Sequence, residues 1–507
     1  MGRDGEGPKE ACGVVGVYAP GEEAARLTYC ALIALQHRGE ESAGIAVSEG
    51  DSIVVVKDMG LVSQVFDDRK LSSLTGHIGI GHVRYSTTGA SVWENSQPAY
   101  RTDGAIALAL AHNGNLVNSL ELAARFHDPL LGWSPTTSTD SDLIAALVAG
   151  SGRRSAEEGI LEVLPHLRGA FSLTLMDERT VFGARDPHGL RPLVLGRLAE
   201  GYALASETCA LDIMGATLIR EIEPGELVTV DERGVRSHRF APATPALCVF
   251  EYVYFARPDS KLSGKSVYQV RYRMGRRLAE EAPAQADLVI PVPDTASPAA
   301  AGYAAASGIP HGAGFVKNPY VGRTFIQPSQ TVREQGIRTK LNPLAEVIEG
   351  RRLVVVDDSI VRGSTTRQIV HRLRNAGAAE VHMRISSPPI RWPCFYGIDT
   401  ANRDELIAAW MSIEEIRSVI EADSLAYLSL EALVAATEVG RDRLCTACFS
   451  SDYPIPVSDH VKVSKHMLEE TPGAQGDART PGIARRSPSE RPRVLPGRVP
   501  SGRGAPG

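Results

Sequence analysis

The sequence predicts a chain of two domains, an α+β sandwich followed by a doubly wound α/β domain. Residues 13–245 contain many short apolar strands separated by turn residues, which is typical of one sheet stacked on another. From about residue 265, helical stretches alternate with continuous valine and isoleucine runs, which indicate parallel strands buried on both faces. Proline and alanine dominate residues 241–246, where we place the boundary between the domains.

In the first domain, a strand is expected wherever a short apolar run is bounded by turn residues. In chain order these runs are GVVGVY, GIAVS, SIVVV, HIGIGHV, AIALALAH, FSLTLMD, VFGAR, PLVLG and YALASE. Two longer stretches, EEAARLTYCALIALQHR and DSDLIAALVAG, are expected to be helices that flank the sheets.

In the second domain, helices and strands alternate along the chain. Helices are expected at YQVRYRMGRRLAEEA, ASPAAAGYAAASG and TTRQIVHRLRNAG, and strands at DLVIPVP, RRLVVVDDS and EVHMRISS. This alternation predicts a parallel sheet whose strands are joined by crossover helices.

The composition is that of a soluble globular protein, with 43% hydrophobic residues, 22% charged residues and a net charge of -6. This charge provides no broad positive field, so we do not expect nucleic acid or membranes as partners. We expect small molecules instead. Residues 1–11 lack the apolar core of a secretory signal, and no apolar run is long enough to cross a membrane. We therefore expect a cytoplasmic protein.

The C-terminal residues 467–507 are rich in proline, glycine, serine and arginine. They contain too little apolar surface to offset the entropy that ordering would cost. We expect a disordered, solvated tail; contact of its arginines with RNA or an acidic partner is the alternative.

The stretch LVVVDDSIVRGSTT, residues 353–366, carries the strongest functional signal. A buried strand delivers Asp357 and Asp358 at its carboxyl end, where open α/β sheets bind ligands. A helix is expected to follow, and its free N–H groups and the hydroxyls of its first turn favour a phosphate. That turn consists of Gly363, Ser364, Thr365 and Thr366. The pattern suits a sugar phosphate; an acidic turn before a well-capped helix is the alternative.

A second strand end, PVPDTA at 291–296, precedes a long polar stretch at 317–342. A loop of this length in a compact domain is usually functional, and positive charge suits a departing pyrophosphate. We interpret it as a lid; an ordinary solvated loop is the alternative. Its cations are Lys317, Arg323, Arg333, Arg338 and Lys340.

Cys12, in the stretch ACGVVG, has two interpretations. It is either a buried thiol that opens a strand, or a nucleophile whose own amine is exposed by removal of residues 1–11. Three other motifs of the first domain, HVRYSTTG, AHNGNLVN and STDSDL, are each weak signals alone.

Together with Cys12 and LQHRGEESAGI, these motifs resemble the glutamine amidotransferase domain of the N-terminal nucleophile class. The stretch VVVDDSIVRGSTT resembles the binding motif of type I phosphoribosyltransferases, whose substrate is phosphoribosyl pyrophosphate (PRPP). The combination is similar to one family over about residues 12–460, the amidophosphoribosyltransferases, and to its cluster-containing, propeptide-bearing branch.

The resemblance implies a propeptide, a glutaminase domain and a phosphoribosyltransferase domain. These would be residues 1–11, an N-terminal nucleophile hydrolase αββα sandwich at 12–245, and a type I phosphoribosyltransferase doubly wound parallel sheet at 246–466.

In the glutaminase domain, the resemblance implies that Cys12 is the nucleophile and that its α-amine is the general base. Arg84 would bind the α-carboxylate of glutamine and Asp140 its α-amine. The Asn113 side chain and the Gly114 N–H would form the oxyanion hole.

In the transferase domain, the resemblance implies that Asp357 and Asp358 bind the ribose and, with Thr295, Mg²⁺. Residues 363–366 would hold the 5′-phosphate, and Lys317 and Arg323 would close over the pyrophosphate.

Four cysteines form a further pattern. Cys445 and Cys448 are a CxxC pair, which by itself is compatible with zinc, an iron–sulfur cluster or a redox dithiol. The resemblance implies that these two, with Cys248 and Cys394, bind a structural [4Fe-4S] cluster. Cys30 and Cys209 are expected to serve packing only.

The implied activity is glutamine hydrolysis at Cys12, followed by passage of ammonia to the second site and attack on C1 of PRPP. The products would be 5-phosphoribosylamine, glutamate and pyrophosphate, in the first committed step of de novo purine synthesis. The resemblance also implies inhibition by purine nucleotides of the AMP, GMP and ADP class, and a dimer or tetramer. A PRPP-sensing regulator without catalysis and a type 2 glutamine amidotransferase with another acceptor are the alternatives.

Overall fold

The computed structural model describes residues 12–85, 91–104, 106–125, 139–318, 341–398, 400 and 402–457. The predicted propeptide at 1–11, most of the predicted lid including Arg323, and the predicted tail at 467–507 lie outside the described residues. The domain limits at 245 and 466 stay a prediction.

The first half of the chain forms two antiparallel sheets. In spatial order, the seven-stranded sheet contains β11 (Thr217–Glu221), β9 (Val194–Leu198), β10 (Gly201–Ala205), β1 (Gly13–Tyr18), β4 (Ile78–Arg84), β2 (Ser42–Ser48) and β3 (Ile53–Met59). The six-stranded sheet contains β13 (Gly234–Arg239), β12 (Glu226–Asp231), β8 (Val181–Arg185), β7 (Gly169–Met176), β6 (Ile106–Leu116) and β5 (Ala99–Asp103).

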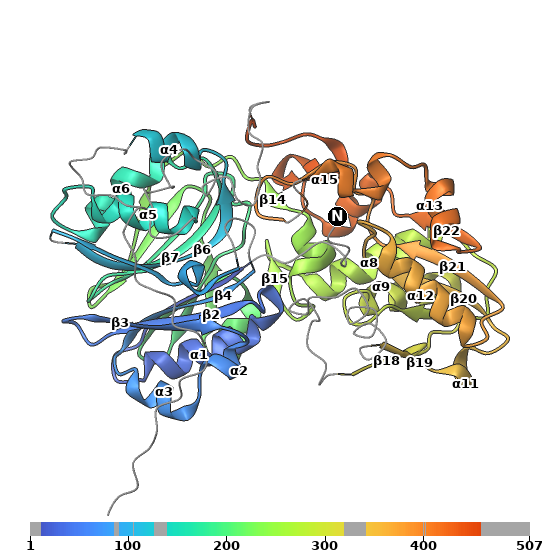
Figure 1. Cartoon of the computed structure of the whole chain (residues 1–507), viewed down its shortest axis with the longest axis horizontal. Coiled ribbons are helices and arrows are strands. Elements are labelled where there is room, and N and C mark those ends of the chain that lie inside the picture. Colours follow the sequence, from blue (N-terminus) through green and yellow to red (C-terminus); the bar gives the residue numbers. More distant parts are fainter. Residues whose placement is uncertain are drawn as a thin grey trace, which may run out of the picture. The chain divides into compact units, whose positions relative to one another are not determined.

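Helices cover the outer faces of both sheets (Figure 1). One layer consists of α1 (Ala24–Ala34), α2 (Val62–Val65), α3 (Asp68–Ser73) and α7 (Thr208–Ile213), and the other of α4 (Ser119–Arg125), α5 (Asp140–Ala149) and α6 (Ala156–Val163). The alternation of a strand explains the layers: in β1, Val15 and Val17 face the helices while Val14 joins the core between the sheets. The predicted αββα sandwich is confirmed.

The second half contains a parallel sheet of β17 (Leu288–Pro291), β20 (Arg352–Asp357), β21 (Glu380–Ile385) and β22 (Ser424–Tyr427). Helices α8 (Val267–Glu281), α9 (Ser297–Ser307) and α14 (Leu430–Thr437) share one core with Val354 and Val356. Helices α12 (Ser364–Asn375) and α13 (Ile413–Ile420) share the other with Leu353 and Val355. The predicted doubly wound sheet is confirmed.

This half of the chain also contains short elements, besides 3-10 turns at Arg403–Glu405, Ile407–Ala409 and Arg441–Arg443. They are β14 (Leu247–Cys248), a π-helical turn at Glu251–Phe255, β15 (Lys261–Leu262), β16 (Lys265–Ser266), β18 (Phe315–Lys317), β19 (Leu341–Pro343), α11 (Ala345–Ile348), β23 (Leu444–Cys445) and α15 (Ala447–Ser450).

The direction of winding changes at β17. After α9 the chain returns to one side of this strand, where His311 forms a parallel bridge with Val289. The later strand β20 pairs with the other side, with Val354 opposite Val289. Such a switch point opens a crevice at the carboxyl ends of the two strands, which are followed here by residues 292–296 and by Asp357.

A fully buried charge network joins residues of the two halves. Glu251 accepts hydrogen bonds from Arg38 Nη2 at 2.6 Å and from Arg191 Nη1 at 3.1 Å. Arg38 also donates to Glu207, and that pairing holds the pKa of Glu207 well below its usual range although burial opposes it. Because each group is at most 1% exposed, any one of them left unpaired would be a costly buried charge.

The two cysteines outside the predicted sites differ in exposure. Cys209 is buried, but Cys30 is exposed on α1, so the packing prediction was wrong for Cys30.

Among the residues that the structure describes, no helix has the length and apolar character needed to cross a membrane.

The close approach of α8 and α9 depends on two glycines and generates a stability prediction. A Cβ atom on Gly275 would lie 1.8 Å from the Ala299 carbonyl oxygen, and one on Gly302 would lie 2.0 Å from that of Tyr272. Gly275→Ala is therefore expected to lower the free energy of unfolding by roughly 1–3 kcal/mol, measured by urea denaturation. Arg276→Ala, on the exposed side of α8, is the control and is expected to change it by less than about 0.5 kcal/mol. Equal effects of the two substitutions would contradict this account.

Candidate active sites

The first site is built around Cys12, the residue before β1. Because Gly13 pairs with Val83, Cys12 lies beside the end of β4. Its Sγ donates a hydrogen bond to the Tyr85 carbonyl at 3.3 Å and accepts one from the Tyr85 N–H at 3.4 Å. Burial raises the pKa of the Cys12 thiol, although Tyr85 and Arg84 oppose the shift. The thiol is thus protonated at neutral pH, and it needs a base before it can act as a nucleophile.

Charges of both signs, those of Arg84, Glu41 and Asp140, lie near this thiol. Arg84, the last residue of β4, is 2% exposed, and Asp140, the first residue of α5, is 5% exposed. Both act electrostatically on Cys12, Arg84 lowering and Asp140 raising the pKa of the thiol. Their separate positive and negative groups match the two charged ends of an α-amino acid.

Asp140 is held in its ionised form. The Leu116 N–H donates to its Oδ2 at 3.1 Å, and His112 Nδ1 lies 3.6 Å from its Oδ1. Burial favours the neutral acid, but His112 and the backbone donors outweigh this effect and lower the pKa of Asp140. The carboxylate can therefore pair with an ammonium group.

The strand β6 supplies a donor site. The Asn113 side chain is fully buried, and neither its Nδ2 nor its Oδ1 has a hydrogen-bond partner among the described residues. Gly114 has a φ of +147°, and a Cβ atom there would lie 2.0 Å from the Ala170 carbonyl oxygen, so only glycine fits. A buried amide without a partner calls for an explanation, and an oxyanion of a bound substrate would supply one.

The second site lies at the switch point. Asp357 ends β20, and Asp358 follows it; they are 8% and 9% exposed. Burial raises the pKa of Asp358 to about 6, against the Ser359 hydroxyl and Arg271, which lower it. Burial and the neighbouring Asp358 raise the pKa of Asp357. Two adjacent carboxyl groups that resist ionisation are a place where a cation or sugar hydroxyls would bind favourably.

The predicted phosphate loop opens α12 as expected. Gly363, with a φ of +78°, precedes the helix and brings no side chain over its first turn. The N–H groups at the start of this twelve-residue helix lie one short loop after Asp358, where the helix dipole favours an anion. Ser364 and Thr365 are half-buried and Thr366 is buried.

The described end of the predicted lid also reaches this site. Lys317 ends β18 and its Nζ contacts the side chain of Asp294, in the loop after β17. Thr295 is half-buried in the same loop, and this loop lies beside Asp357 because Pro291 pairs with Val356. The structure thus brings together the described residues that were predicted for this site. Arg323 and the other lid cations Arg333, Arg338 and Lys340 lie outside the described residues.

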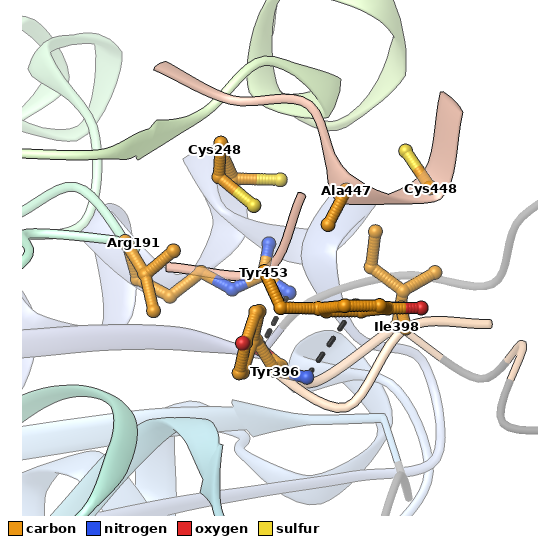
Figure 2. A pocket seen from close by; sticks show the side chains of 10 residues that line it. Arg191, Cys248, Tyr396, Ile398, Ala447, Cys448 and Tyr453 are labelled. Atoms are coloured by element: carbon orange, nitrogen blue, oxygen red, sulfur yellow. Dashed lines mark hydrogen bonds between the residues drawn. The ribbon is translucent and has the colours of Figure 1, made fainter. Parts of the chain in front are cut away.

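The four predicted cluster ligands line one small cavity (Figure 2). Cys248 and Cys445 are paired across the parallel strands β14 and β23, Cys448 lies in α15, and Cys394 lies in the loop after β21. All four are free thiols. Burial raises the pKa of each, that of Cys248 to about 12, so an apolar cavity holds four thiols whose deprotonation needs a cation.

Four cysteines around one cavity match the number of cysteine ligands that an iron–sulfur cluster takes. In the described part of the chain, no group of three or more His, Cys, Asp or Glu side chains has the arrangement of a metal-ion site. A zinc ion would need its sulfurs about 2.3 Å from one point. A cluster of several irons takes its cysteines on different iron atoms and accepts a wider arrangement of the same ligands.

Several residues at these sites were not found from the sequence. His112 adjoins Asn113 in the AHNG motif, so it had a local signal. Asn115 Nδ2 donates to the Phe395 carbonyl at 3.0 Å, and a Cβ atom on Gly397 would lie 3.1 Å from the Gly114 carbonyl carbon. The loop that carries Cys394 therefore packs on the strand that carries Asn113, a contact without any local signal.

The fold and the two sites define a class of protein: a glutamine amidotransferase domain joined to a domain of the phosphoribosyltransferase type. A family model described as a glutamine amidotransferase domain matches residues 82–212.

Relatives and solved structures match nearly the whole chain. The amidophosphoribosyltransferase of Mycobacterium tuberculosis is 56% identical over 478 residues, which are 92% of this chain and 90% of the relative. That of Synechococcus elongatus is 54% identical and covers 91% of this chain and 95% of its own length. The structure of glutamine PRPP amidotransferase from Bacillus subtilis complexed with ADP and GMP is 46% identical, with a TM-score of 0.82 over 89% of this chain and 98% of that one. The chain belongs to the amidophosphoribosyltransferase family.

The buried His82 of β4 generates a prediction about acid stability. It is fully buried, with Nε2 3.0 Å from the His112 carbonyl oxygen, and burial lowers the pKa of His82 to about 3. An unfolded histidine binds its proton near pH 6.5, so between that pH and about 3 the unfolded chain binds more protons than the folded chain. Stability is therefore lost as the pH falls through this range.

In urea denaturation between pH 7 and pH 4, the wild-type chain is expected to lose more unfolding free energy than His82→Gln. The difference should grow by at most about 1.4 kcal/mol per pH unit below pH 6.5. Parallel pH profiles for the two proteins would show that His82 does not titrate in this way.

Proposed function

We propose that this chain makes 5-phosphoribosylamine from PRPP, glutamine and water, with release of glutamate and pyrophosphate. The observation that carries the proposal is the presence, in one chain of this family, of a Cys12 site with paired charges and an Asp357-Asp358 site at a switch point. The first suits hydrolysis of an amino-acid amide, and the second suits a phosphorylated sugar. The reaction is the first committed step of de novo purine synthesis.

At the first site, removal of residues 1–11 would free the Cys12 α-amine, which would take the proton of its own thiol. Arg84 and Asp140 would hold the α-carboxylate and α-ammonium groups of glutamine. The thiolate would attack the side-chain amide, and Asn113 with the Gly114 N–H would stabilise the oxyanion. Loss of ammonia leaves a thioester on Cys12, which water hydrolyses to glutamate.

At the second site, the N–H groups of residues 363–366 would bind the 5′-phosphate of PRPP, and Lys317 would neutralise the pyrophosphate. Asp357 and Asp358 would bind the ribose hydroxyls and, with Thr295, hold Mg²⁺. When bound, Mg²⁺ would neutralise charge on the leaving pyrophosphate. Ammonia arriving from the first site would attack C1. Arg323, within the predicted lid, is proposed to join Lys317.

We also propose that the chain belongs to the cluster-containing, propeptide-bearing branch, with a [4Fe-4S] cluster held by Cys248, Cys394, Cys445 and Cys448. The shared cavity of four thiols supports this. Such a cluster would tie the segment after α14 to β14 and to the loop after β21.

Purine nucleotides are the proposed inhibitors, because the related structure from Bacillus subtilis is complexed with ADP and GMP. A dimer or tetramer is proposed for the assembled enzyme.

The first test concerns Cys12. The protein purified anaerobically is expected to have an intact mass that corresponds to a chain beginning at Cys12. Cys12→Ala is expected to abolish glutamine-dependent synthesis, a loss of at least about 10³-fold, while ammonia-dependent synthesis at the second site persists. Cys209→Ala, another buried thiol, is the control and should retain both activities. Loss of both activities in Cys12→Ala, in a folded protein, would contradict two separate sites.

The second test concerns the acidic pair. Asp357→Asn and Asp358→Asn are expected to reduce synthesis from PRPP by about 10²-fold or more, with either glutamine or ammonia. Glutamine hydrolysis measured without PRPP should remain. Asp287→Asn, an exposed carboxylate paired with Arg352, is the matched control. A variant of the pair that kept full synthesis would remove the second site from the proposal.

The third test concerns the contact between β6, which carries Asn113 and Gly114, and the loop that carries Cys394. Asn115→Ala removes the hydrogen bond to Phe395 and is expected to lower glutamine-dependent synthesis about tenfold while ammonia-dependent synthesis is kept. Asn118→Ala removes a similar hydrogen bond to the His166 carbonyl, 3.0 Å long, away from the loop, and is the control. An equal loss in both activities would indicate general destabilisation instead.

A further inference from the structure

The cavity of the four cysteines contains one positive charge. Arg191, between β8 and β9, lines the cavity together with all four cysteines, and Figure 2 shows it beside Cys248 and Tyr396. The side chain is 1% exposed, so its charge is shielded from water. An isolated charge in such a place would be very costly, and the guanidinium must find its partners inside the protein.

Two of the three guanidinium nitrogens have partners. Nη1 donates to Glu251 Oε1 at 3.1 Å, and Nη2 donates to the Tyr396 carbonyl at 3.1 Å. The third, Nε, is buried and has no hydrogen-bond partner among the described residues. An arginine N–H left in this state costs free energy, so its presence at a cavity wall points to an acceptor inside the cavity.

The charges around Arg191 also indicate a negatively charged group inside the cavity. Its carboxylate partner Glu251 is shared with Arg38, and Arg38 is in turn paired with Glu207. Of these four groups only Arg191 lines the cavity, and the two carboxylates do not. The cavity therefore offers a donor and a positive charge to a group that is itself negative.

An iron–sulfur cluster with four thiolate ligands is such a group, because its sulfurs accept hydrogen bonds and the ligated cluster is negatively charged. Hydrogen bonds to the sulfurs and the local charge are two of the factors that set its reduction potential.

We propose that Arg191 is the counter-cation of this centre, that its Nε–H donates to a cluster sulfur or a ligand thiolate, and that it stabilises the reduced cluster. The inference rests on the proposed cluster and goes beyond it by assigning a tuning residue. Reduction adds one electron and hence one negative charge to the cluster, so the positive charge of Arg191 favours the reduced form.

The test is a potentiometric titration of the anaerobically purified holoenzyme, followed by the electron paramagnetic resonance signal of the reduced cluster. Dithionite or a stronger low-potential reductant supplies the electron. Arg191→Gln is expected to lower the potential by at least about 59 mV, which corresponds to a tenfold change for one electron. Arg191→Lys keeps the charge and is expected to shift it less.

Arg384→Gln is the control, because it removes another buried guanidinium, one that donates to the Ala282 and Pro283 carbonyls and does not line the cysteine cavity. It is expected to keep the wild-type potential. A wild-type potential in Arg191→Gln, or an equal shift in Arg384→Gln, would overturn the assignment of Arg191.

A measurement on the unaltered chain covers the case in which Arg191→Gln does not fold. In holoenzyme labelled with ¹⁵N-arginine, pulsed electron paramagnetic resonance of the reduced cluster is expected to show coupling to a ¹⁵N nucleus, and Arg191→Lys should lose it. A reduced cluster without this coupling would overturn the hydrogen bond. Native protein without iron and sulfide would overturn the proposed cluster and this inference with it, whereas an intact cluster with either negative result overturns the inference alone.

Discussion

The pairing of the buried Glu251 carboxylate with two arginines is the interaction on which the arrangement of both sites depends. The carboxylate has no exposed surface and accepts hydrogen bonds from two guanidinium groups, those of Arg38 and Arg191. Because a buried carboxylate without its partners would be strongly destabilising, the segments that carry these residues must meet in one geometry. Arg38 lies in the glutaminase sandwich, and Glu251 begins the π-helical turn that precedes α8 in the transferase half. The network is thus a polar connection that specifies position as well as contributing to stability.

The hydrogen bonds of Arg191 also link the two sites through the loop that carries Cys394. Arg191 binds the carbonyl of Tyr396, and the neighbouring Phe395 carbonyl accepts from Asn115 on β6. The loop that carries Cys394 therefore contacts the first site directly, while β20 and β21 lead from the second site to that loop.

Each site obtains its chemistry from burial. At Cys12 and at the acidic pair, burial raises the pKa of the thiol and of the two carboxyl groups, so that a charge brought by a ligand would favour their ionised forms. At Asn113 and Arg191, burial leaves a donor unsatisfied at the place where an oxyanion or a sulfur would bind. These features lower the stability of the empty protein and favour the occupied one.

The sequence by itself determined those features whose residues are neighbours along the chain. The valine runs specify buried parallel strands, the short apolar run GVVGVY specifies a buried strand, and Asp357 with the helix start at Gly363 places acids and phosphate donors within one loop. The roles of Arg84, Asp140, Cys248 and Cys394 came from the family resemblance, because no local pattern relates residues so far apart. Only the tertiary structure decided that Arg38, Glu251 and Arg191 share one network, and that the Cys394 loop packs on β6. The physical reason is that such contacts depend on which surfaces the sheets and helices bury against each other, and a local sequence window does not contain that information.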